Sequence, residues 1–375
     1  MRICLSAPNT LGYPAGGHVW VFINWALGLQ SLGHEVIWFD VVEDKYPAEK
    51  VPGLTRRMLD RLRPFGLDKQ VVLCGHGGEK HPSEFPLRDL EDATSCDLLI
   101  NLRYNLPRPI LNAFKHTAMI DIDPGQFQKA VEWGTYDVGE HGSYFTVGEW
   151  TNYRHLSKVN DLGKQWTHIP PPVALEAWPV TPAPPDAAMT TVSGWYMAGQ
   201  WMSEEKDVWY DNSKQAAFQM VIDIPKESPV PLELCIDTIG YPDELGLLHG
   251  KGWRTHLSTS VDDPQVYRRY VQNSLGEFSC AKPAYVRMNS GWLSDRTACY
   301  LASGKPVVIQ KTGPSDFLPD AKGCYRFTDY AGALQSLQAM ANDYDAACKA
   351  ARGLAEEFLD AKKVLPKVLE IAMNA

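Results

Sequence analysis

The sequence predicts an α/β protein of two Rossmann-like domains that face each other across a cleft, with helices closing the chain. A β-loop-α-β pattern opens the sequence, and a pattern of the same kind begins again after a proline-rich segment near the middle. The length of 375 residues agrees with two domains at roughly 150 residues each.

The first forty residues contain the opening unit. Arg2–Ala7 is a short apolar strand, and Pro8–Gly17 is a loop with turn-forming residues. Val19–Leu32 carries apolar residues at helical spacing, Gly33 is suited to end that helix, and Glu35–Val41 is a second strand. Later apolar runs predict further strands of the same parallel sheet at Val71–Cys74, Asp97–Leu102, Ala118–Ile122 and Tyr144–Val147.

Prolines between Ile169 and Met189 exclude both a helix and a central strand there. We therefore assign residues 1–170 to an N-terminal domain, 171–190 to a linker and 191–375 to a C-terminal domain. The second domain is expected to contain strands at Thr191–Met197, Leu232–Thr238, Thr255–Ser258, Gly276–Ser279 and Pro306–Gln310, and helices at Val266–Ser274 and Ser294–Ala302. From Tyr330 to Ala375 the chain is expected to be helical, with interruptions near Asp343 and Pro366.

Composition narrows the class of protein. Apolar residues make up 45% and charged residues 22%, which is typical of a globular chain. The net charge of −9 argues against a general nucleic-acid binder, which needs a basic face. The eight cysteines are scattered without metal-ligand spacing, so no metal site is predicted and a reducing cytosol is expected. No signal peptide or membrane span is present in the sequence, which predicts a soluble cytoplasmic protein.

The segment Gly276–Gly313 carries the clearest binding chemistry. Ser294 is suited to cap a helix that has Asp295 in its first turn, and such a helix N-terminus beside a glycine-bearing loop favours a phosphate. Cationic side chains that would suit a diphosphate flank it, namely Lys282, Arg287 and Arg296. Thr312-Gly313 follows the next strand, where it either donates hydrogen bonds to phosphate or sugar or forms an ordinary β-α turn.

In the N-terminal domain, Gly16-Gly17 permits the close approach of a donor phosphate or an acceptor, because neither residue has a Cβ. His18 follows at the carboxyl end of the first strand. A histidine, whose ordinary pKa lies near 6.5, can act there as a base toward a hydroxyl. The alternative is that His18 packs at the start of the helix.

Carboxylates follow two other predicted strands. Asp121 and Asp123 end one of them, where either residue could orient His18 or act as the base itself. The alternative is that Asp123 begins an Asp-Pro-Gly turn. Glu149 occupies a similar position after the next strand and is assigned to the acceptor side.

The run SDRTACYLASGKPVVIQKTG resembles the donor-binding region of GT-B glycosyltransferases, in particular bacterial glycosyltransferase-like proteins related to CgeB. The segments GGHVWVFINWALGLQSLGHEV and IDIDPGQFQ are similar to the same group, so the resemblance covers most of the chain. It implies metal-independent transfer of a sugar from a nucleoside-diphosphate sugar to a hydroxyl acceptor, with no other cofactor. The N-terminal stretch also resembles inverting members of the fold, in which a histidine at the position of His18 deprotonates the acceptor.

One position departs from the family pattern. Many retaining GT-B enzymes carry a glutamate seven residues before the proline of this motif, where it often holds the donor ribose, and here that residue is Cys299. Asp295 is the candidate for the ribose contact instead. The missing glutamate also weakens any inference of a retained anomeric configuration.

Two other functions stay open at this point. A phage-type DNA glycosyltransferase acting on a hydroxymethylated base would need a local basic face, for which a stretch on one predicted helix is available: Arg56, Arg57, Arg61, Arg63 and Lys69. A solvated helix face explains the same residues. The other alternative is a non-catalytic nucleotide-sugar-binding protein, or an envelope or spore protein, that keeps the fold without the chemistry.

Overall fold

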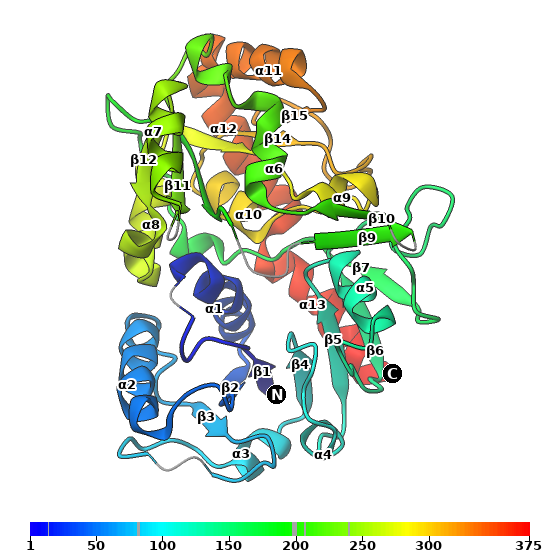
Figure 1. Cartoon of the computed structure of the whole chain (residues 1–375). Coiled ribbons are helices and arrows are strands. Elements are labelled where there is room, and N and C mark those ends of the chain that lie inside the picture. Colours follow the sequence, from blue (N-terminus) through cyan, green and yellow to red (C-terminus); the bar gives the residue numbers. More distant parts are fainter. Residues whose placement is uncertain (14, 81–82, 197–200, 206–207, 239–240) are drawn as a thin grey trace.

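The computed structural model describes residues 1–13, 15–80, 83–196, 201–205, 208–238 and 241–375. It contains two parallel sheets, each covered by helices and placed one above the other (Figure 1). The order of the first sheet is β3-β2-β1-β4-β5-β6-β7, and that of the second is β12-β11-β8-β13-β14-β15. Both sheets therefore share the Rossmann order, in which the first three strands are added toward one edge and the later strands are added on the other side of the first strand. The predicted fold class is confirmed.

The strands of the first sheet are β1 (Arg2–Ser6), β2 (Glu35–Val41), β3 (Val71–Cys74), β4 (Leu98–Asn101), β5 (Thr117–Asp121), β6 (Ser143–Thr146) and β7 (Trp166–His168). Those of the second are β8 (Met189–Gly194), β11 (Leu232–Asp237), β12 (Arg254–Leu257), β13 (Gly276–Ser279), β14 (Val307–Gln310) and β15 (Cys324–Phe327). A separate antiparallel ribbon consists of β9 (Trp201–Glu205) and β10 (Val208–Asp211). Met197, the predicted end of the strand here called β8, lies outside the described residues.

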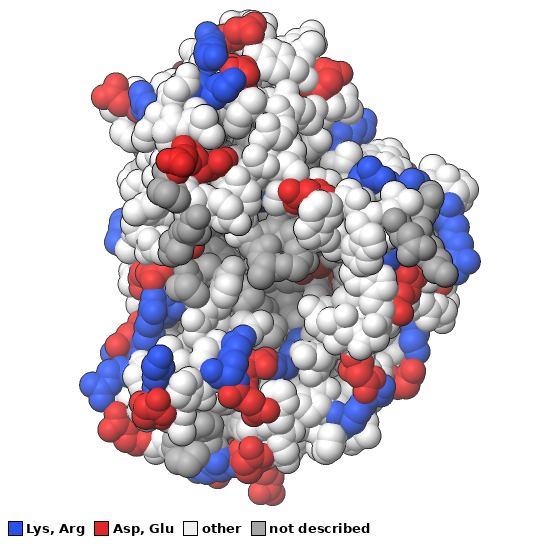
Figure 2. All heavy atoms as spheres, in the orientation of Figure 1, with Lys and Arg blue, Asp and Glu red and all other residues white. Residues whose placement is uncertain are grey.

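The helices that accompany the first sheet are α1 (Gly16–Ser31), α2 (Val51–Leu62), α3 (Leu90–Thr94), α4 (Arg108–Leu111) and α5 (Gln126–Glu132). The second half contains α6 (Lys214–Phe218), α7 (Pro242–Gly250), α8 (Pro264–Asn273), α9 (Pro283–Arg287), α10 (Asp295–Ala302), α11 (Tyr330–Asn342), α12 (Tyr344–Leu354) and α13 (Ala361–Asn374). Figure 2 shows that the molecular surface is hollowed between the two halves.

Helix α1 begins at Gly16, three residues before the predicted start, and Gly33 follows its end with a positive φ of 83°. The predicted helix stop at Gly33 is therefore confirmed. The earlier start places Gly16, Gly17 and His18 in the first turn of α1. The N–H of His18 donates to the Ala15 carbonyl at 3.1 Å, whereas those of Gly16 and Gly17 have no backbone partner among the described residues.

Helix α13 returns to the first half of the molecule. It packs on α1 so closely that a Cβ added to Gly28 would lie 2.5 Å from the Cβ of Ala361. The predicted interruption at Pro366 is wrong, because α13 continues through this residue, which is exposed on the surface of the helix. The chain instead bends at a π-helical turn, Ala355–Leu359, and the predicted interruption at Asp343 is confirmed.

The first part of the proline-rich segment is packed into the protein. Trp178 is fully buried, and its indole N–H donates to Oδ1 of Asn24 on α1 at 3.1 Å. The same oxygen accepts the backbone N–H of Ala174, and Val173 pairs with Asp360 before α13. These contacts tie the segment to α1 and to the C-terminal helices.

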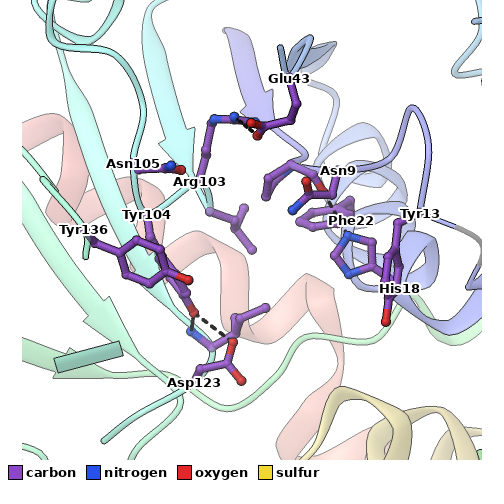
Figure 3. A pocket seen from close by; sticks show the side chains of 13 residues that line it. Asn9, Tyr13, His18, Phe22, Glu43, Arg103, Tyr104, Asn105, Asp123 and Tyr136 are labelled. Carbon is purple, nitrogen blue, oxygen red and sulfur yellow. Dashed lines mark hydrogen bonds and ion pairs between the residues drawn. The ribbon is translucent and has the colours of Figure 1, made fainter. Parts of the chain in front are cut away.

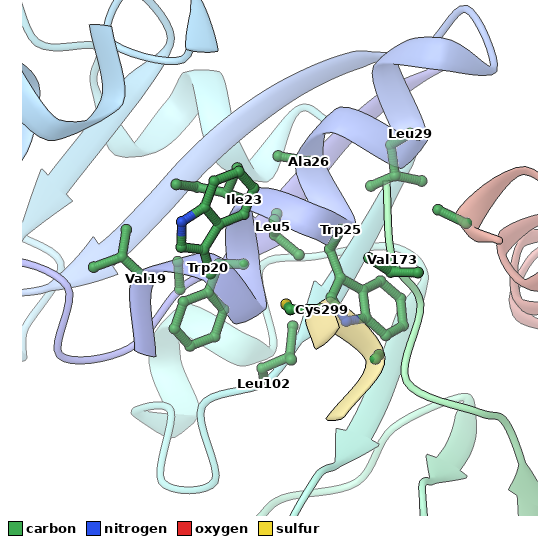
Figure 4. Close-up of a cluster of buried hydrophobic side chains, with 14 of the residues drawn as sticks. Leu5, Val19, Trp20, Ile23, Trp25, Ala26, Leu29, Leu102, Val173 and Cys299 are labelled. Carbon is green, nitrogen blue, oxygen red and sulfur yellow. The ribbon is translucent and has the colours of Figure 1, made fainter. Parts of the chain in front are cut away.

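The main hydrophobic core continues from the first half into the second. Trp20 and Trp25 of α1 lie beside the side chain of Cys299 from α10, as Figure 4 shows. The amide of Asn24 also approaches the Cys299 sulfur at 3.6 Å. All eight cysteines are free, and seven of them are buried. No helix among the described residues is long and apolar enough to cross a membrane.

Candidate active site

Two cavities lie at the carboxyl ends of the two sheets, where ligands bind in folds of this type. The first-sheet cavity, of about 360 Å³, is lined by residues that follow its strands: Asn9 after β1, Glu43 after β2, Arg103, Tyr104 and Asn105 after β4, and Asp123 after β5. The interdomain cavity, of about 410 Å³, is lined by residues after β8, β11 and β12 and by the first turns of α1 and α10. Each cavity therefore lies where a ligand is expected.

Tyr13 and His18 line both cavities, so the two spaces meet at the start of α1. Figure 3 shows His18 on one side of the first-sheet cavity, with Tyr104, Tyr136 and Asp123 on the other. A group held in one cavity would therefore lie next to a group held in the other, with the imidazole ring at the junction.

The ring of His18 is fixed by three neighbours. Its Nε2 lies 2.8 Å from the carbonyl oxygen of Pro8, and the ring centres of Tyr13 and Phe22 each lie 5.1 Å from that of His18, in edge-to-face arrangements. Because a carbonyl can only accept, Nε2 must carry the proton, and the lone pair of the neutral ring is on Nδ1. Burial lowers the pKa of His18 from 6.5, although the Pro8 carbonyl and Asp123 oppose this shift. The neutral, basic form therefore predominates at pH 7.

Asp123 lies across the first-sheet cavity from His18. One carboxylate oxygen accepts the hydroxyl of Tyr285 from α9 at 2.6 Å, and the other accepts the hydroxyl of Tyr104 at 3.3 Å. The backbone of Ile122 donates to the same Tyr104 hydroxyl. Asp123 thus joins the two halves of the protein at the floor of the cavity, and its charge favours a protonated His18.

Asp121 has a different environment from the predicted one. It is fully buried and lines neither cavity. Its oxygens accept from the side chains of Gln128 and Thr146 and from the backbone of Asp123, at 2.9 to 3.0 Å. Burial raises its pKa to about 7. Asp121 is therefore a structural link between β5, α5 and β6, and the geometry does not support its assignment as a base or as the partner of His18.

The two glycines before His18 line the interdomain cavity, but the structure gives them a further purpose. A Cβ on Gly16 would lie 2.6 Å from the carbonyl oxygen of Val261, and one on Gly17 would lie 2.8 Å from the ring of Tyr267. The absence of side chains thus allows the first turn of α1 to approach the second half of the protein. From the sequence, we expected these two residues to lack a Cβ so that a donor phosphate or an acceptor could approach.

Ser294 and Asp295 face the interdomain cavity from the start of α10. The Ser294 hydroxyl oxygen accepts the N–H of Arg296 at 3.2 Å, which confirms its expected role as N-cap. Among the described residues, no other side chain donates a hydrogen bond to the carboxylate of Asp295, which accepts its own backbone N–H. Burial raises its pKa to about 7, and the charge of Asp123 adds to this shift. Asp295 is thus available to a ligand hydroxyl.

The raised pKa of Asp295 makes the stability of the protein depend on pH. In the unfolded chain an aspartate titrates at about pH 3.9, so between about pH 4 and 7 the folded protein keeps a proton that the unfolded chain has released. The carboxylate therefore costs stability as the pH rises through this window. Asp295→Asn is expected to raise the melting temperature at pH 8 and to change it little near pH 4.5. An equal change at both values in a thermal denaturation series would contradict the raised pKa.

Arg296 is located beside the cavity, but its guanidinium is bound within the protein. Its Nε donates to the fully buried Glu277 at 2.8 Å, while its Nη atoms donate to the Val192 carbonyl and the Ser279 hydroxyl at 3.0 and 2.6 Å. Three of its five N–H groups are therefore used. The geometry assigns Arg296 to the ion pair with Glu277 and corrects the expectation that its charge is free for a diphosphate.

The other two predicted cations lie away from the residues that line the interdomain cavity. The ammonium of Lys282 lies 3.4 Å from Oε1 of Gln126, on α5 of the first half. The guanidinium of Arg287 lies 4.2 Å from the ring centre of Tyr210 on β10. Both cations therefore face the ribbon and α5, and the structure does not bring them to Ser294.

Thr312 and Gly313 shape the backbone around α9 and α10. The Thr312 hydroxyl donates to the carbonyl of Trp292 at 2.7 Å, and its carbonyl accepts the N–H of Gly291. Gly313 has a φ of 147°, and a Cβ there would lie 3.0 Å from the Gly291 nitrogen. These bonds favour the turn interpretation over direct contact with a donor.

Glu149 also joins the two halves. Its Oε1 accepts the backbone N–H groups of Asp316 and Phe317, at 2.5 and 3.3 Å. It lines a separate cavity of about 230 Å³ together with His168. The structure thus places Glu149 outside the first-sheet cavity.

The position of Cys299 explains the departure from the family pattern. Its sulfur is buried in the core against α1 rather than in the interdomain cavity, and burial raises the pKa of the thiol. Arg103, which no sequence pattern marks, is 2% exposed and is bound by Asp40 and Glu43 at the first-sheet cavity. Its partners lie 63 and 60 residues earlier, on β2 and directly after it, so a local motif could not have shown the contact. Among the described residues, no cluster of three acidic, histidine or cysteine side chains is arranged to hold a metal ion.

No protein-family model and no curated protein matches the chain. Solved structures do. An alpha-glucosyltransferase in complex with UDP-glucose and abasic DNA matches over all of both chains, with a TM-score of 0.61 and 10% identity. HepE from Anabaena, in complex with UDP and glucose, matches over all of both chains at 0.57 and 12%. Sucrose-phosphate synthase from Thermosynechococcus elongatus matches over 99% of this chain and 98% of its own, at 0.57 and 11%. The chain therefore has the two-domain fold of GT-B glycosyltransferases.

Proposed function

We propose that the protein is a glycosyltransferase that transfers a sugar from a nucleoside-diphosphate sugar in the interdomain cavity to a hydroxyl acceptor in the first-sheet cavity. The observation that carries the proposal is His18, which lines both cavities and whose neutral ring carries its lone pair on Nδ1, because Nε2 donates to the Pro8 carbonyl. The fold shared with enzymes solved with UDP and UDP-glucose supports it.

The diphosphate would lie between two helix N-termini. Gly16 and Gly17 in the first turn of α1 and Ser294 and Asp295 at the start of α10 line the same cavity. Backbone N–H groups and helix dipoles favour a negative charge there, and they would stabilise the leaving nucleoside diphosphate without a metal ion. The carboxyl group of Asp295 is the candidate for the ribose hydroxyls.

His18 would then act as the base. Its Nδ1 takes the proton of the acceptor hydroxyl while the acceptor oxygen forms a bond to the anomeric carbon, and the bond from that carbon to the diphosphate oxygen breaks. Attack opposite the leaving group inverts the anomeric configuration. Asp123 faces the ring and would stabilise the imidazolium that forms.

Donor binding tests the proposal directly. A screen of UDP-, GDP-, dTDP- and CDP-sugars by thermal shift is expected to identify one nucleotide class that stabilises the protein. At 100 times its dissociation constant, a ligand adds about 2.7 kcal/mol of stability. If none of the four classes raises the melting temperature, the interdomain cavity is not a donor site.

The geometry does not favour DNA as the acceptor. The arginines in and directly after α2 that were candidates for DNA contacts are engaged by carboxylates, as in the pairs Arg56–Glu84, Arg57–Asp262 and Arg63–Asp60. Figure 2 shows Lys and Arg interspersed with Asp and Glu rather than gathered into one basic patch on that face. A gel-shift salt series with a 30-base-pair duplex distinguishes a DNA acceptor from other hydroxyl acceptors. If DNA is the acceptor, the affinity for the duplex should fall steeply with salt, because the protein would contact its phosphates.

A further inference from the structure

The ribbon formed by β9 and β10 presents tryptophans to solvent. Cross-strand pairing sets Tyr210 opposite Met202, and both side chains pack inward against the apolar group around Met288. Because successive side chains alternate between the faces of a strand, Trp201 and Trp209 lie on the outer face. They are 60% and 53% exposed. One face of the ribbon is therefore anchored, and the two tryptophans on the other face are exposed.

A third tryptophan joins this face from the first half of the protein. Trp133, which follows α5 and is 45% exposed, contacts Trp209 with ring centres 5.4 Å apart and ring planes inclined by 37°. Figure 1 shows the ribbon lying beside α5. We call Trp133, Trp201 and Trp209 the tryptophan platform.

The platform continues from the first-sheet cavity. Tyr136, three residues after Trp133, lines that cavity and contacts Tyr104 at 5.5 Å between ring centres. Tyr104 in turn donates to Asp123. One short segment therefore carries both Tyr136, which lines the cavity, and Trp133, which contacts Trp209.

We propose that the tryptophan platform is an outer acceptor subsite that stacks against the sugars of a neutral oligosaccharide. This inference rests on the proposed function and adds the class of acceptor to it. A pyranose ring has a face of C–H groups and a rim of hydroxyls. An exposed indole can cover that face while the hydroxyls stay in water. Two inclined indole faces suit consecutive sugars of one chain.

The area and charge of the platform favour a glycan over larger partners. A tryptophan side chain covers at most about 250 Å², so the exposed parts of the three together offer roughly 400 Å². A stable protein partner, including a second copy of this chain, would cover about 800 Å². Lipid surfaces bind through apolar residues combined with basic ones. The three tryptophans carry no charge, and the two cations that face the ribbon and α5 contact Gln126 and the inward-facing Tyr210 instead of the outer face.

Maltohexaose, cellohexaose and mannohexaose, each compared with its monosaccharide, probe the platform. Ligand-observed NMR titrations are expected to show at least one hexasaccharide binding tenfold or more tightly than its monosaccharide. The double variant Trp133→Ala/Trp209→Ala should lose that difference. Trp209→Phe should keep it and Trp209→Leu should lose it, because a flat ring rather than apolar area is needed. Leu257→Ala, at an exposed apolar residue elsewhere, is the matched control and should change nothing.

The thermal shift with nucleotide sugars separates this proposal from the proposed function. A donor shift without length-dependent glycan binding overturns the platform and leaves the glycosyltransferase assignment standing. Length-dependent glycan binding without a donor shift keeps the platform and overturns glycosyl transfer. Sedimentation with phosphatidylcholine or phosphatidylserine vesicles, or dimerisation in analytical ultracentrifugation, overturns the glycan assignment if the double alanine variant abolishes it.

Discussion

Replacing His18 by alanine is expected to lower turnover by roughly 10²–10⁴, the usual contribution of a general base, while the affinity for the nucleotide sugar stays within about twofold. The imidazole ring contacts Pro8, Tyr13 and Phe22. The diphosphate would be held by backbone N–H groups at the helix termini, and the substitution removes none of these. Steady-state kinetics with the donor identified by thermal shift, together with a donor titration, measure both quantities.

Two further observations distinguish a base from a packing residue. Because burial lowers the pKa of His18, kcat/KM of the wild type should fall only as the pH drops below 6.5. Added imidazole should partly restore turnover to His18→Ala, since it can occupy the vacated space, and His34→Ala, which is distant from both cavities, is the control. Near-normal turnover of His18→Ala would make His18 structural, and Asp123→Asn would then show whether that carboxylate is the base.

Arg296→Ala is expected to lower the free energy of unfolding by about 3–5 kcal/mol, because it leaves Glu277 buried without its charged partner. The loss should appear in urea denaturation followed by tryptophan fluorescence. Replacing both partners in Arg296→Met/Glu277→Met should recover most of it, since an apolar pair leaves no buried charge.

Lys282→Ala provides a matched control for this prediction. Its ammonium makes one long hydrogen bond to Gln126, so its removal should cost about 1 kcal/mol or less. If Arg296→Ala instead keeps wild-type stability and loses donor affinity, the guanidinium serves the ligand, and the ion pair with Glu277 is not its main function.

The sequence predicted strands that are buried on both faces, because such a strand is a continuous apolar run. The inner strands β2 and β13 and the buried edge strand β3 have the predicted limits. The missed elements lack this signal. β7 is a three-residue edge strand, β15 carries Arg326, and the ribbon contains the charged residues Glu204 and Glu205. Its inner face is specified by contacts with Met288, far away in the sequence.

The candidate site was predictable where position along a strand or helix determines it. His18 and Ser294 lie at helix starts after parallel strands, and the topology brings them to one cavity. Local patterns could not show that Glu277 binds Arg296, or that Asp121 points away from the cavity where Asp123 lies. The environments of Arg296 and Asp121 depend on buried residues that lie far away in the sequence. The charge of a side chain does not show which of these residues it will contact.

A crystal structure of the protein with a bound nucleotide sugar would show directly whether His18 serves as the base between the two cavities. We expect the diphosphate to lie against the backbone N–H groups of Gly17 and Asp295, with the anomeric carbon facing Nδ1 of His18. A nucleotide bound outside the interdomain cavity, or a sugar directed away from His18, would contradict it.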